Sequence, residues 1–192
     1  MSVRSVEMIR KSMASRSLEL RDVLSGGDRR SIGRVPVVLD MVRRRPALAR
    51  QVVAALSDTD PLVRMRAADA LEKASAARPE LLHPHRRELL GLAGQATQQE
   101  LRWHLAQIIP RLPLTRRQRR RAAALLEIYL RDRSAIVRTF AMQALAELAS
   151  KDAALRPGVL PRLKRLASTG TPAMRARGRR LLARLRACEP TS

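Results

Sequence analysis

Arginine carries the most concentrated chemistry in this sequence. Of 192 residues, 39 are basic and 17 acidic, so the formal net charge is +22. The densest run is TRRQRRR, residues 115–121, where five arginines follow a threonine able to cap a helix. Guanidinium groups at a helix N-terminus repel one another and oppose the helix dipole, so the run costs stability. The run predicts contact with a polyanion such as a phosphate backbone; a solvated helix surface is the alternative.

A second set of arginines recurs at a spacing of 36 to 38 residues. Its members are Arg64, Arg102, Arg138 and Arg175. Such a row could hold phosphates, or it could bridge neighbouring segments of the fold. Two members are preceded, six residues earlier, by an aspartate: Asp58 and Asp132. A paired charge favours a structural ladder for Arg64 and Arg138. For Arg102 and Arg175, both interpretations stay open.

The segments around these arginines have the apolar spacing of helices. Val137, Ala141, Ala144 and Leu148 recur at intervals of three or four residues, so they share one helix face. Asp60 before a proline is a helix start signal. Segments of the same kind lie between, and a period near 37 indicates stacked helix pairs. The ten predicted helices span residues 4–24, 31–45, 47–57, 60–74, 80–94, 98–112, 115–131, 134–148, 156–168 and 171–185.

Composition agrees with an all-α fold. The chain is 45% hydrophobic and 2% aromatic, and strand-favouring residues are sparse beside Ala, Leu and Arg. The single cysteine, Cys188, excludes an intramolecular disulfide, and no apolar run approaches the roughly 20 residues that span a bilayer. Glu7 and Glu19 argue against a transit peptide at the Arg- and Ser-rich start. We therefore expect a cytoplasmic protein with no membrane association.

The repeating segments resemble HEAT repeats, and the similarity covers nearly the whole chain. That family places an aspartate six residues before an arginine of the second helix, as at Asp58 and Asp132, and favours a proline in the first helix, as at Pro161. Ala96 and Thr169 stand where the family has aspartate, so those turns are expected to be held differently. The resemblance implies a right-handed α-solenoid with its second helices on the concave side. The expected single domain, residues 1–187, divides into approximate repeats 1–45, 46–77, 78–112, 113–150 and 151–187, followed by a tail over 188–192.

The concave face should carry the remaining candidates. Trp103, the single tryptophan, points 200° away from Leu101 on a helical wheel, with Gln107 one turn further on. An exposed aromatic residue is typical of binding surfaces, although the indole could instead cover a neighbouring helix. The predicted partner-binding residues are Arg102, Trp103, His104, Gln107, Gln143, Arg175, Arg177, Arg180, Arg184, Arg116, Arg117, Arg120 and Arg121.

Residues suited to catalysis are few. No histidine is followed by glutamate, so the His-Glu pairs of HEAT-type di-iron hydroxylases are missing, and no ligand cluster has metal spacing. HEAT-like alkylpurine DNA glycosylases surround a catalytic carboxylate with several aromatics. Here Trp103 stands alone, and the nearest acid on the aligned rows is Asp69. Glycosylase activity is therefore a minor alternative, and no catalytic residue, metal or cofactor is predicted.

The sequence predicts a non-enzymatic scaffold that binds an acidic partner. A nucleic-acid phosphate backbone, DNA or RNA, is the favoured partner, and base-specific contacts are not expected. The alternative is an adaptor whose concave groove binds a partner protein. Both functions use the same fold, and no small-molecule substrate is expected. The oligomeric state stays open.

Overall fold

The computed structural model describes residues 20–28 and 31–187, and it is all-α, as the sequence predicts. No strand occurs in these two ranges. The chain divides into two compact units, Met1–His85 and Arg86–Ser192. The single domain expected over residues 1–187 stays a prediction. The expected helix over 4–24 falls mostly outside the described residues, as do Cys188 and the tail, although 20–24 are helical.

The first unit packs two helices against a longer one. Its elements are α2 (Val35–Arg44), η1 (Pro46–Leu48), α3 (Ala49–Ala55), α4 (Pro61–Ala77) and η2 (Pro79–His85). Both α2 and α3 contact α4. The predicted start of α4 is confirmed, because the Asp60 carboxylate accepts a hydrogen bond from the Leu62 N–H at 2.8 Å and Pro61 follows it.

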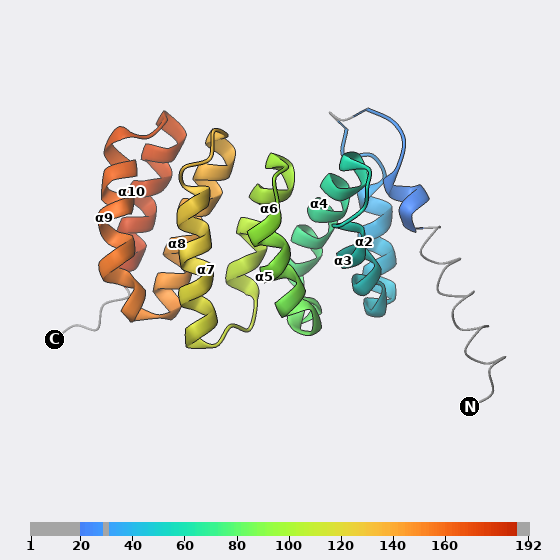
Figure 1. Ribbon diagram of the computed structural model, residues 1–192, viewed down its shortest axis with the longest axis horizontal. Helices are drawn as coiled ribbons and strands as arrows, with labels where there is room; N and C mark the ends of the chain where they lie inside the picture. Colours follow the sequence, from blue (N-terminus) through green and yellow to red (C-terminus); the bar gives the residue numbers. More distant parts are fainter. Residues whose placement is uncertain (1–19, 29–30, 188–192) are drawn as a thin grey trace. The chain divides into compact units, whose positions relative to one another are not determined.

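The second unit consists of three successive helix pairs (Figure 1). Its elements are α5 (Arg86–Gln95), α6 (Gln99–Ile108), η3 (Ile109–Arg111), α7 (Arg116–Tyr129), α8 (Ala135–Lys151), η4 (Ala153–Leu155), α9 (Arg156–Thr169) and α10 (Pro172–Ala187). Helices α6, α8 and α10 contact one another in sequence order and form the second-helix layer. Helices α5, α7 and α9 form the first-helix layer. The core lies between the layers, where Val137, Ala141, Ala144 and Leu148 of α8 are all buried, as predicted.

Prolines shorten two predicted helices. The predicted helix over 80–94 begins only at Arg86, because Pro84 has no N–H for a helical hydrogen bond and residues 79–85 form a 3-10 turn instead. The predicted helix over 98–112 ends at Ile108, and Pro110 lies in the 3-10 turn that follows. The periodicity identified these helices correctly, but their boundaries were wrong.

Arg66 holds the backbone of residues 24–28 through hydrogen bonds. Its buried guanidinium donates hydrogen bonds to the backbone carbonyls of Leu24, Gly26 and Asp28 at 2.9, 2.6 and 3.1 Å. These carbonyls belong to the end of the helix at 20–24 and the turn after it, where no helical N–H is available. Arg66 therefore has a structural role that its sequence position did not reveal.

Among residues 20–28 and 31–187, every helix is too short or too polar to cross a lipid bilayer.

Candidate functional site

The four recurring arginines close the turns inside the helix pairs. Each donates from its second helix to a carbonyl that follows the first helix of its pair. The bonds are Arg64 to Asp58 at 2.7 Å, Arg102 to Ala96 at 2.7 Å, Arg138 to Asp132 at 2.6 Å and Arg175 to Gly170 at 3.4 Å. Carbonyls at a helix C-terminus lack helical partners, so the guanidinium supplies the missing donor. The repeated position therefore has the same structural task in all four segments, including those without the aspartate.

The aspartates of the expected ladder pair with different arginines. The Asp132 carboxylate accepts a 2.5 Å hydrogen bond from Arg102, whose helix belongs to the preceding pair, and a 2.8 Å bond from the Ser134 N–H. Asp58 pairs in the same way with Arg21 at 2.9 Å. Burial alone would raise the pKa of Asp132, but these two hydrogen bonds hold that pKa below its usual value. Arg102 is thus bound within the fold.

Several predicted partner-binding residues of the second-helix layer make contacts within the fold. His104 is buried, and the half-buried Trp103 lies with its ring centroid 5.5 Å from that of His104. Arg177 donates to the Gln143 side chain at 2.9 Å, and its guanidinium lies 5.2 Å from the Phe140 ring centroid.

Of the other predicted residues of this layer, some contact neighbouring groups of the protein and others are exposed to solvent. Gln107 is half-buried and its side chain donates to the Trp103 carbonyl at 3.3 Å. Arg180 and Arg184 are exposed and form no ion pair within the described residues. Arg175 is exposed but donates to its own turn. Exposed arginines that form no ion pair with the described acids are therefore found on α10 of this layer.

The arginine run lies on the outer face of α7. Its predicted cap is confirmed, because the Thr115 hydroxyl accepts from the Gln118 N–H at 3.3 Å while the Gln118 side chain accepts from the Thr115 N–H at 3.0 Å. The opposite face, with Ala122 and Leu126, is buried. Four arginines of the run are exposed: Arg116, Arg117, Arg120 and Arg121.

A single carboxylate compensates this run within the described residues. Asp152 lies 3.3 Å from the Arg119 Nε and 3.9 Å from the Arg116 Nε. Burial alone would raise the pKa of Asp152, but hydrogen bonds from Arg119 and from the Ala154 N–H keep that pKa below its usual value. Arg117, Arg120 and Arg121 form no ion pair with the described acids.

Arg87 of α5 extends this basic surface, and the sequence analysis missed it. Two contacts show that α5 and α7 lie parallel: Arg86 donates to the Pro113 carbonyl at 3.0 Å near their N-termini, and Tyr129 to the Ala93 carbonyl at 2.6 Å near their C-termini. The exposed Arg87 therefore lies at the same end as the run. We name Arg87, Arg116, Arg117, Arg120 and Arg121 the α7 cluster.

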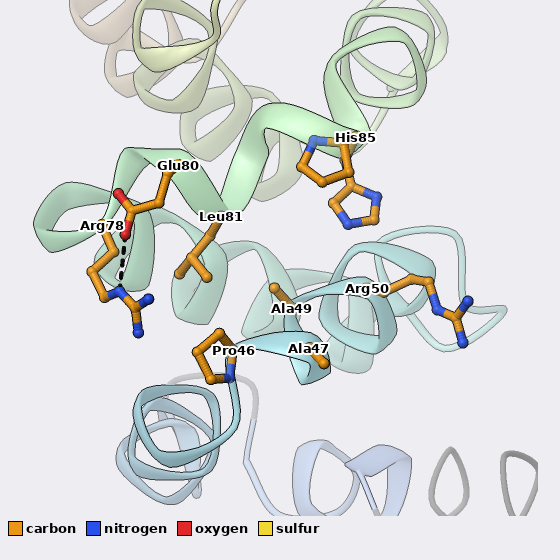
Figure 2. Close-up of a pocket in the computed structure, with 9 residues that line it drawn as sticks. Pro46, Ala47, Ala49, Arg50, Arg78, Glu80, Leu81 and His85 are labelled. Carbon is orange, nitrogen blue, oxygen red and sulfur yellow. Dashed lines mark hydrogen bonds and ion pairs between the residues drawn. The ribbon is translucent and has the colours of Figure 1, made fainter.

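A hollow of about 370 Å³ lies in the first unit, but its lining residues do not form a catalytic arrangement. Arg78 and Glu80 form an ion pair of 3.0 Å. Figure 2 shows this pair on one side of the hollow and His85 on the other, while Arg50 points away. Asp69, the acid considered for glycosylase chemistry, is paired with Lys73 at 2.7 Å. Within the described ranges, no three His, Cys, Asp or Glu side chains could hold a metal ion together.

No protein-family model matches this sequence, and no curated protein sequence is detectably similar to it.

Proposed function

We propose that this protein is a non-enzymatic scaffold that binds the phosphate backbone of a nucleic acid through the α7 cluster. The observation that carries the proposal is the set of exposed arginines at the N-termini of α5 and α7, where the one carboxylate of the described residues that compensates the run is the buried Asp152 after α8. Guanidinium groups bind phosphate oxygens through paired, charge-assisted hydrogen bonds. A polyphosphate would remove the mutual repulsion that these arginines now impose on α7.

The scaffold that we propose is a right-handed α-solenoid of five HEAT-like pairs. Three features support it. The second unit consists of successive helix pairs, neighbouring helices contact one another within each layer, and an arginine closes the turn in four segments. Such an architecture suits binding over an extended surface, because each helix pair adds side chains at the equivalent position beside those of the preceding pair.

The side chains favour contact with phosphates over contact with bases. Trp103, Tyr129 and Phe140 are the only aromatics of the chain. Tyr129 is buried and hydrogen-bonded, and Phe140 lies against Arg177. Without aromatic side chains to stack on bases, the affinity of this surface for a nucleic acid should depend strongly on salt concentration and only weakly on base sequence.

One observation supports protein binding as the second candidate function. A hollow of about 210 Å³ lies between α8 and α10, lined in part by Ile136, Thr139 and Phe140. Ile136 is 50% exposed, which is unusual for a large apolar side chain. An adaptor would use this hollow of the second-helix layer, whereas the nucleic-acid proposal uses the first-helix layer.

The experiment compares duplex binding by three forms of the full chain. Arg117→Gln, Arg120→Gln and Arg121→Gln are combined, and fluorescence anisotropy measures the affinity for a labelled 20-base-pair duplex at 0.1 M salt. Loss of three phosphate contacts lowers affinity by about 100-fold or more. The matched control combines Arg34→Gln, Arg45→Gln and Arg186→Gln, which remove equal charge from other exposed positions. Equal loss in both variants would mean that net charge, not the α7 cluster, drives binding.

A further inference from the structure

A basic hollow lies at the C-terminal end of α7, at the other end of this helix from the α7 cluster. Its volume is about 360 Å³, and it lies between the turn that joins α5 to α6 and the turn that joins α7 to α8. We name it the turn pocket. Its lining residues are Thr97, Gln99, Arg102, Arg131, Asp132 and Arg133.

The walls of the turn pocket are held by hydrogen bonds between the two turns. Arg102 donates both to the Ala96 carbonyl of the first turn and to the Asp132 carboxylate of the second. Arg138 donates to the carbonyls of Asp132 and Arg133 at 2.6 and 2.9 Å. Because these bonds fix both turns before any ligand arrives, binding here costs little ordering of the backbone.

The charge inside the turn pocket is positive. Both oxygens of Asp132 accept hydrogen bonds within the fold, from Ser134 and Arg102, so this carboxylate is already compensated. Arg131 and Arg133 are exposed and form no ion pair with any acid in the described ranges. Two guanidinium groups thus remain available at the mouth, beside the side chains of Thr97 and Gln99.

We propose that the turn pocket binds a phosphate group, and that this phosphate belongs to the backbone held by the α7 cluster. This inference rests on the proposed function. Arg131 follows Arg117 by 14 residues, which is about 21 Å along a helix. Arg117, Arg121, Ala124 and Ile128 are exposed along one side of α7, and the exposed Arg131 follows in the turn after the helix. A duplex along this face would reach from one basic end to the other over about six base-pair steps.

The test removes the two available guanidinium groups with Arg131→Gln and Arg133→Gln. Loss of one phosphate contact lowers duplex affinity about 8-fold at 0.1 M salt and makes the salt slope about 0.9 less negative. The control is Arg34→Gln with Arg45→Gln. A second arm follows the backbone N–H signals of Thr97 and Gln99 by NMR as inorganic phosphate replaces chloride at constant ionic strength; these signals shift in the intact protein and not in the variant.

The outcomes separate the two proposals. If this variant binds duplex like the intact protein while the α7-cluster variant has lost binding, the turn pocket takes no backbone phosphate and the proposed function stands. Signals that shift with inorganic phosphate in that case would identify a site for free phosphate and would overturn the assignment to the backbone. If both variants bind like the intact protein, both proposals are wrong.

Discussion

The Arg102–Asp132 pair gives a prediction about stability that separates a structural arginine from a ligand-binding one. Arg102→Met keeps an aliphatic side chain over the Tyr129 ring, which lies 5.4 Å from the guanidinium, but removes the bonds to Ala96 and Asp132. A hydrogen bond to a charged group contributes about 1.5–3 kcal/mol and a neutral one about 1 kcal/mol. The Arg102 side chain is 28% exposed and that of Asp132 only 4%, so solvent replaces part of the lost interaction.

We expect Arg102→Met to lower the free energy of unfolding by about 3 kcal/mol, at the lower end of what breaking a buried ion pair costs. For a chain of this length, thermal unfolding followed by circular dichroism should show a midpoint lower by about 6–12 °C. Asp132→Asn should cost about 2 kcal/mol, since the amide still accepts from Ser134. The double variant should then show a coupling energy of about 1–2 kcal/mol.

A coupling energy near zero would refute this reasoning. So would an Arg102→Met variant that unfolds like the intact protein but binds duplex weakly, because Arg102 would then act on the ligand and not on the fold.

Three further predictions concern packing and acid stability. Gly33→Ala should destabilise the first unit by about 3 kcal/mol in denaturant unfolding, because Gly33 has φ +56° and a Cβ there would lie 2.6 Å from the Arg66 guanidinium carbon. Gly178→Ala should cost about 1 kcal/mol despite better helix propensity, because its Cβ would lie 2.8 Å from the Ala167 Cβ of α9. Because the pKa of Asp152 is lowered, its contribution to stability is present above the ordinary aspartate pKa of about 3.9 and is lost as pH falls below it. Asp152→Asn should therefore flatten that part of a pH–stability curve, and an unchanged curve would contradict the pairing.

Local sequence patterns correctly predicted features that lie within a single helix, namely its buried face and its start. The spacing around Val137 identified the buried face of α8, and Asp60 and Thr115 marked helix starts that the structure confirms. These features depend on neighbours within one or two turns, which a sequence shows directly. A structural role for Arg64 and Arg138 could be predicted as well, and the structure shows both donating to backbone carbonyls of their turns.

Contacts between helices could not be predicted in this way. Arg102 and Asp132 are 30 residues apart, and no spacing inside a segment reveals that pairing. A helical wheel orients Trp103 against its own helix but says nothing of the neighbour, so the burial of His104 and the packing of Arg177 on Phe140 were missed. Contacts within the fold therefore hold several of the predicted binding residues of the second-helix layer, and the exposed Arg87 lies at the same end as the arginine run on a separate helix.

The salt dependence of duplex binding tests the central claim most directly. The affinity of the intact protein and of the triple α7-cluster variant is measured between 0.05 and 0.5 M salt, and log affinity is plotted against log salt concentration. Five cluster contacts and a smaller contribution from the turn pocket predict a slope of about −5 for the intact protein and about −2 for the variant, from roughly −0.9 per phosphate. A slope near zero, or the same slope for both proteins, would contradict the account.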